Sequence, residues 1–191
     1  MTKGRLEAFS DGVIAIIITI MVLELHPPQG ASFGDLGDLW PTFAAYLLSF
    51  VLLGIYWANH HHLLQAARTV NGPALWANLH LLFWLSLFPF GTAWVGRSTF
   101  APVPVATYGA LLLLAAIAYY LLVQALIHVP EQVPTLATAV GRDLKGTISP
   151  ILYLVAVPVA LVVPALSLAI YVLVALIWIG PDRRMERALR D

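Results

Sequence analysis

Cysteine is absent from this chain of 191 residues, and charged residues make up only 10% of it. Without cysteine, the chain forms no disulfide, no thiolate metal site and no cysteine nucleophile. Ten basic and ten acidic residues give a formal net charge of zero. No strongly basic or acidic tail is present, so nothing in the charge pattern predicts binding to nucleic acid.

The chain also lacks any polar stretch long enough to fold as a separate soluble domain. Hydrophobic residues account for 60% of the sequence, and the mean hydropathy is +0.85. A soluble globular domain has a far more polar balance than this. We therefore predict one all-α integral membrane domain over residues 1–191, with the lipid bilayer as its solvent.

The first predicted membrane span covers residues 7–25. At ~1.5 Å per residue, a helix of this length reaches roughly 28 Å, which is enough to cross a bilayer once. Lys3 and Arg5 precede it as in a signal peptide. The apolar run is too long for a signal peptide and no small-residue cleavage pattern follows, so we expect the segment to be retained.

Further apolar stretches follow at residues 40–60, 75–95, 105–127 and 148–180. The last would be roughly 48 Å long as a single helix, which exceeds a ~30 Å hydrocarbon core. Pro164 predicts a tight break within it, giving two short spans of roughly 15 to 18 residues. The sequence therefore predicts a bundle of six transmembrane helices.

Basic residues are distributed unequally between the two sides of such a bundle. With six spans, only Arg97 falls on one side, and all other basic residues share the opposite side: Lys3, Arg5, Arg68, Arg142, Lys145, Arg183, Arg184, Arg187 and Arg190. Basic residues concentrate in cytoplasmic loops of membrane proteins. We therefore predict a multi-pass protein of the cell membrane with both termini in the cytoplasm.

Polar residues gather at one depth, near the cytoplasmic ends of the first three spans. They are Ser10 and Asp11 in span one, residues 59–62 in span two, and Asn78 and His80 in span three. Because buried polar groups in membranes must satisfy one another, we expect Asp11 to be a buried structural acid bonded to a span-two histidine or to Asn78.

Histidines and a carboxylate are also metal-ligand types, so a metal site is an alternative interpretation of this cluster. However, neighbouring residues on a helix point ~100° apart, so His60, His61 and His62 do not converge on one point. No HxxxH or HExxH pair is present. The spacing favours a structural network over a metal site or a membrane-embedded hydrolase.

An apolar stripe follows one side of the first span. At ~100° per residue, it contains Phe9, Val13, Ile16, Ile20 and Leu23, with Asp11 roughly on the reverse face. Because Ile14, Ile17 and Ile18 are equally apolar, periodicity alone does not say which face meets a pore, a neighbour or lipid.

One short motif is specific enough to indicate a family. The run Arg5-x-x-x-Phe9-Ser10-Asp11-Gly12 at the start of the first span resembles the RxxxFSD signature of the transmembrane protein 175 family of potassium channels, prokaryotic branch. Further matches follow in order along the chain: Trp57, His60 and His61 at the end of span two, and Asn78, Pro89 and Phe90 in span three. The resemblance covers essentially the whole chain.

This resemblance implies a homotetramer whose first helices line a central, potassium-permeable pore, with no enzymatic activity and no cofactor besides the permeant potassium ion. Carried over by offset from the signature, Ile16 is the narrowest ring of the pore, Ile20 and Leu23 lie above it, and Thr19 lies beside them. The remaining matched residues are structural: Arg5, Phe9, Ser10, Asp11, Gly12, His60, His61 and Asn78.

Two other expectations concern the charged groups. Glu24, together with Asp35 and Asp38, gives the outer mouth a negative potential that concentrates cations, unless all three are simply solvated. The alternative function is an ion- or proton-coupled transporter that uses Asp11 and the histidines as a relay. An ionisable group on the ion pathway would distinguish that transporter from a passive channel.

Overall fold

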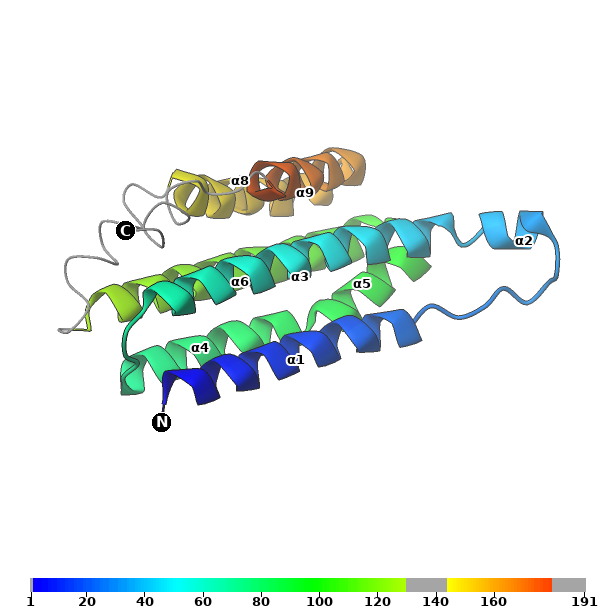
Figure 1. Ribbon diagram of the computed structural model, residues 1–191. Coiled ribbons are helices and arrows are strands. Elements are labelled where there is room, and N and C mark those ends of the chain that lie inside the picture. The colour runs from blue at the N-terminus through cyan, green and yellow to red at the C-terminus, as the bar shows by residue number, and fades with distance from the viewer. Residues whose placement is uncertain (1, 130–143, 180–191) are drawn as a thin grey trace.

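The computed structural model describes residues 2–129 and 144–179, and every regular element in these ranges is a helix (Figure 1). Most of the predicted long polar connection and the arginine-rich C-terminal segment lie outside the described residues. The basic residues within the described ranges are Lys3, Arg5, Arg68, Arg97 and Lys145.

The first two spans form as long helices separated by a proline-containing loop. Helix α1 runs Lys3–Leu23, and α3 runs Trp40–Ala66. Between them, the short helix α2, Phe33–Gly37, begins with a capping box in which Ser32 and Asp35 bond each other's backbone amide groups. Pro41 lies in the first turn of α3, where its missing N–H costs no helical hydrogen bond.

The third span is a broken helix. Helix α4 runs Gly72–Ser86 and α5 runs Phe88–Arg97, with the interruption at Leu87. Pro89 lies in the first turn of α5 and lacks the N–H that would continue the ladder of α4. Asn71 caps the other end of the span by accepting a hydrogen bond from the Ala74 amide at 3.0 Å.

The remaining spans are α6, Pro102–Ile127, and the shorter pair α8, Leu144–Ala160, and α9, Pro164–Ile179. The chain turns between α8 and α9 directly before Pro164, which confirms the predicted break. Four helical stretches are long and apolar enough to cross a membrane, namely 3–23, 33–66, 72–97 and 102–127, while α8 and α9 are apolar but shorter. The predicted all-α six-span fold is therefore confirmed.

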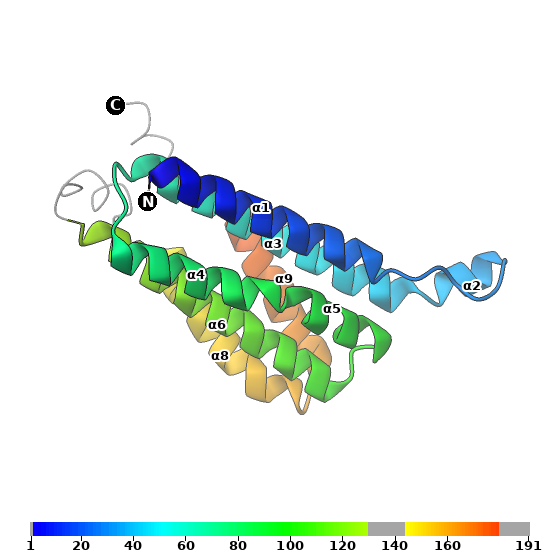
Figure 2. The same ribbon diagram turned by 90° about the horizontal axis from the view of Figure 1, so that it is seen from below.

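The helices pack in three layers, with α1, α4 and α5 in the first, α3 and α6 in the middle, and α8 and α9 in the third (Figure 1). Helix α1 packs on α3, α4 and α5, whereas α6 contacts α4, α5, α8 and α9. Seen from below, the start of α1 lies beside the end of α3, and α2 projects beyond the opposite end of the bundle (Figure 2).

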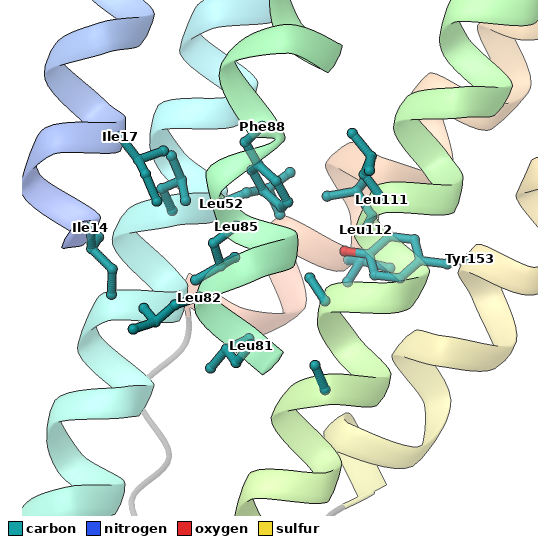
Figure 3. Packing of buried hydrophobic residues seen from close by; sticks show 14 of the residues in the cluster. Ile14, Ile17, Leu52, Leu81, Leu82, Leu85, Phe88, Leu111, Leu112 and Tyr153 are labelled. Atoms are coloured by element: carbon teal, nitrogen blue, oxygen red, sulfur yellow. The ribbon is translucent and has the colours of Figure 1, made fainter. Parts of the chain in front are cut away.

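The core fills the spaces between these layers with branched and aromatic side chains. Figure 3 shows Ile14 and Ile17 of α1 on the side of the helix that faces Leu82 and Leu85 of α4. At the third layer, a Cβ added to Gly109 would lie 2.0 Å from the Tyr171 hydroxyl, which itself donates to the Val105 carbonyl at 3.2 Å. Glycine at this position allows α9 to approach α6 closely.

Candidate functional site

Helix α1 presents two different faces. One face is buried within the chain and carries Leu6, Ser10, Ile14, Ile17 and Met21. The other is exposed, with exposed fractions of 49% for Phe9, 58% for Ile16, 42% for Ile20 and 75% for Leu23. The periodicity of the sequence did not say which face of α1 is buried. Packing against α3, α4 and α5 determines that face.

Four of the five residues of the predicted stripe are exposed, and Val13 is the exception. Val13 is partly buried and packs against the core. Gly12 is exposed, and nothing lies within 4 Å of where its Cβ would be. Thr19 is also exposed, and its hydroxyl donates to the Ile16 carbonyl at 2.9 Å. That proton is therefore used within the helix.

The buried face contains a chain of hydrogen bonds that joins three helices. Ser10 Oγ donates to the Leu6 carbonyl at 2.9 Å, and Asn78 Nδ2 of α4 donates to Ser10 Oγ at 2.9 Å. Asn78 Oδ1 then accepts from His60 Nε2 of α3 at 2.7 Å. Ser10, His60 and Asn78 are each 0% exposed. Because the Asn78 amide nitrogen faces Ser10, its oxygen faces His60, which must donate from Nε2.

Asp11 does not belong to that buried chain, so the predicted partner was wrong. Its carboxylate is partly exposed and accepts a hydrogen bond from Trp57 Nε1 at 3.0 Å. The physical reason is the helical step of ~100°, which places Ser10 in the middle of the buried face and its neighbour at the edge beside α3. The residue that meets Asn78 and His60 is therefore the serine of the signature.

The other histidines point in different directions, as the ~100° step predicts. His61 Nδ1 lies 3.2 Å from Glu7 Oε1, and the His61 ring stacks on Trp57. His80 accepts from Trp84 Nε1 at 2.8 Å within α4. Within the described ranges, no group of three histidine, cysteine or acidic residues is placed to hold a metal ion.

These partners bear on the transporter alternative. Asp11 bonds to an indole, which does not titrate, and no hydrogen bond within residues 2–129 and 144–179 links Asp11 to a histidine. The sequence analysis predicted neither Trp57 as the partner of Asp11 nor Glu7 as the partner of His61. A signal was present for Glu7, because it lies four residues before Asp11 and therefore on the same side of α1.

At the other end of α1, Glu24 is paired. Its Oε2 lies 2.6 Å from Arg97 Nη2 at the end of α5. Asp35 caps α2 through Ser32. Arg97 therefore offsets the local charge of Glu24, while the effect of the three acids on permeating cations stays a prediction. Arg5 is exposed at the opposite end.

Comparisons with known proteins agree with this architecture. The sequence model of the family described as "Endosomal/lysosomal potassium channel TMEM175" matches residues 5–89. A protein described as a potassium channel of Chryseobacterium sp. (strain P1-3) is 52% identical over 191 residues, covering 100% of both chains. The human endosomal/lysosomal proton channel TMEM175 is 33% identical over 96 residues, which cover 44% of this chain and 19% of the human protein.

Among solved structures, the crystal structure of a lysosomal potassium-selective channel TMEM175 homolog from Chamaesiphon minutus superimposes with a TM-score of 0.80 at 29% identity. The match covers 93% of this chain and 96% of that one. These relatives are named as channels rather than enzymes, in agreement with the absence of an enzymatic motif. On the full-length match at 52% identity, this chain belongs to the TMEM175 family.

Proposed function

We propose that this chain is the subunit of a potassium-permeable channel that conducts passively across the cell membrane as a homotetramer. Support comes from the full-length similarity to a protein described as a potassium channel and from the likeness to a crystal structure described as a potassium-selective channel. The same apolar helices that predict membrane insertion also supply the walls of such a channel.

The observation that carries this proposal is the exposed apolar face of α1. Ile16, Ile20 and Leu23 are exposed in the single chain although they lie on a membrane-spanning helix whose opposite face is fully packed. Four copies of this face around an axis would line a pore, with Ile16 as the narrowest ring and Thr19 beside it. The Thr19 hydroxyl proton is donated within the helix, so its oxygen faces that wall as an acceptor only.

Such a pore would act on ions through width and dehydration. A β-branched side chain has a restricted χ1, so four copies of Ile16 form a stiff apolar ring. The ring offers a permeating ion no replacement for its water, and it therefore gates by dewetting or by diameter. Ions would cross the pore without any chemical reaction, so no cofactor is needed.

The orientation with cytoplasmic termini is part of the proposal. Lys3 Nζ donates to the Ala67 carbonyl at 3.0 Å, so the start of α1 and the end of α3 lie at one end of the bundle, where Arg5 and Arg68 also lie. Arg97 lies at the opposite end, beside Glu24. This distribution supports the cytoplasmic assignment of the first end.

Purified protein in liposomes provides the direct test. A potassium gradient alone should drive flux in vesicles that contain the protein, with no second ion required. Native mass spectrometry of the same preparation should give a tetramer. Flux that depends strictly on a proton or sodium gradient would instead favour the coupled transporter, and a dimer would contradict the four-fold pore.

A further inference from the structure

A second candidate site lies away from the exposed face of α1. A cavity of about 310 Å³ opens between the middle and third layers of the bundle, and its walls come from α3, α6, α8 and α9. Helix α1 contributes no lining residue. The volume falls in the range of pockets that bind small molecules, roughly 300–1,000 Å³.

Part of the polar wall of this cavity is internally hydrogen-bonded. The Tyr119 hydroxyl donates to the Asn59 carbonyl at 3.2 Å, and Asn59 Nδ2 donates to the Ile55 carbonyl at 2.8 Å. Across the cavity, Trp178 Nε1 donates to Ser149 Oγ at 2.8 Å. These bonds fix the side chains that frame the cavity.

Two other tyrosines in the wall have no such partner. The hydroxyls of Tyr56 and Tyr153 form no hydrogen bond within the described part of the chain, although Tyr153 is only 2% exposed. Figure 3 shows the Tyr153 ring extending from α8 towards Leu112, with its hydroxyl at the far end. The Tyr56 ring is held by edge contacts with Phe88 and Tyr119.

A tyrosine hydroxyl can donate one hydrogen bond and accept another, and most polar groups inside proteins are hydrogen-bonded. Two unpaired tyrosine hydroxyls in the wall of one cavity therefore offer hydrogen bonds to a ligand that carries an oxygen. The other lining residues are uncharged, and many are apolar, including Leu52, Ile55, Ala116, Val123 and Ile127. The wall thus matches an uncharged molecule with an apolar body.

We propose that this cavity binds an uncharged aromatic amphiphile, such as a phenol or an aromatic alcohol, whose oxygen bonds to the hydroxyls of Tyr56 and Tyr153. The four tyrosine rings around the cavity offer faces and edges for an aromatic body. The site includes α3, the helix whose other side packs on α1, so its occupant contacts a direct neighbour of the proposed pore helix. Binding itself does not depend on conduction, and the test below uses no flux.

The test uses the full chain in lipid nanodiscs and two photoreactive probes. One probe is a phenol that carries a diazirine, and the other is the same compound with hydrogen in place of the hydroxyl. Adducts are mapped by mass spectrometry. We expect saturable labelling of peptides that contain Tyr56 or Tyr153 by the phenol, and at least several-fold weaker labelling by the probe without the hydroxyl.

Three variants make the assignment specific. Ala116→Phe fills the cavity and should abolish saturable labelling, whereas Ala44→Phe, whose side chain lines a different cavity, should leave it unchanged. The double variant Tyr56→Phe/Tyr153→Phe keeps both rings and should make the two probes label equally. If Ala116→Phe does not fold, the double variant still tests whether the probe binds through these two hydroxyls.

The proposal is overturned by any of three results. These are equal labelling of the wild-type chain by both probes, labelling that does not saturate, or labelling by the phenol that survives both Ala116→Phe and the double variant. The last result would place the adducts on the lipid-facing surface rather than in the cavity.

Discussion

The two faces of α1 differ in how far the rest of the chain buries them. On the buried face, Asn78 bonds to both Ser10 and His60, and Ile17 is 3% exposed. On the opposite face, Ile16 and Leu23 are 58% and 75% exposed. One face therefore holds α1 in the fold of the chain, and the other is the face on which the proposed pore depends.

This difference explains why polar residues lie on the face that is already packed. A hydroxyl, an amide and an imidazole in the membrane need fixed partners, and the interior of the helix bundle supplies them at hydrogen-bond distance. The exposed face has no such partners, and it carries isoleucine and leucine. Ser10 and Asp11 of the signature thus bond α1 to its neighbours, while Ile16, Ile20 and Leu23 beyond it form the proposed pore wall.

The largest expected effect comes from breaking the buried face with Asn78→Leu. The variant leaves His60 Nε2 without its acceptor and removes the donor to Ser10 Oγ, which keeps its bond to the Leu6 carbonyl. An unsatisfied buried group costs about 1–3 kcal/mol. We expect a clear fall in the thermal unfolding temperature of the solubilised protein and loss of assembly on size exclusion.

Asn59→Leu is the matched control, because the Asn59 amide bonds only to a carbonyl in its own helix. It should destabilise the protein less. If the two substitutions proved equally costly, the three-helix chain of hydrogen bonds would not be what holds α1.

The comparison between the faces is tested most sharply by Ile17→Ala against Ile16→Ala. Truncation at the buried Ile17 should cost about 2–5 kcal/mol of unfolding free energy. At the exposed Ile16, stability should change little, but conductance should rise and discrimination between potassium and sodium should weaken. Single-channel recording and thermal unfolding separate the two effects. If Ile17 rather than Ile16 governed conduction, the pore face would be rotated by ~100°, and Ile20 and Leu23 would leave the pore wall with it.

A smaller effect is expected at the edge between the faces, where Trp57 bonds to Asp11. Trp57→Phe keeps an aromatic ring on His61 but removes the indole donor, and since Trp57 is 46% exposed, water replaces part of the bond. We expect a loss of about 1 kcal/mol in unfolding free energy. Asp11→Ala should impair folding or assembly by a similar amount. A stable tetramer with altered selectivity as its sole change would instead place Asp11 on the ion pathway.

The smallest effect on stability is expected at the exposed pair of Glu24 and Arg97, because such pairs contribute about 0.2–1 kcal/mol. Their effect on conduction should be electrostatic. At low salt, Arg97→Gln should raise potassium conductance by leaving Glu24 unneutralised, and Glu24→Gln should lower it. At high salt, both changes should fade because ions screen the field. The same conductance for both variants at low salt would mean that the pair is simply solvated.

The sequence by itself determined the class and the outline of this protein. Composition and apolar run length indicate a membrane protein, and Pro164 marks the turn between α8 and α9 because proline cannot continue a helical hydrogen-bond ladder. The short signature at Arg5 to Gly12 led to the correct family because several side chains at fixed spacing are specific. The depth at which Ser10, His60 and Asn78 meet was also predictable, since helix length fixes depth in a bilayer.

Only the tertiary structure decided which residues meet at that depth and which face of α1 remains open. Apolar side chains surround α1 almost uniformly, so its periodicity carries no preference between Ile16 and Ile17; contact with α3, α4 and α5 supplies it. The partner of Asp11, the pairing of Glu24 with Arg97 and the two tyrosines without a partner likewise depend on helices that are distant in sequence. Local spacing does not encode such contacts, because they arise from how whole helices pack.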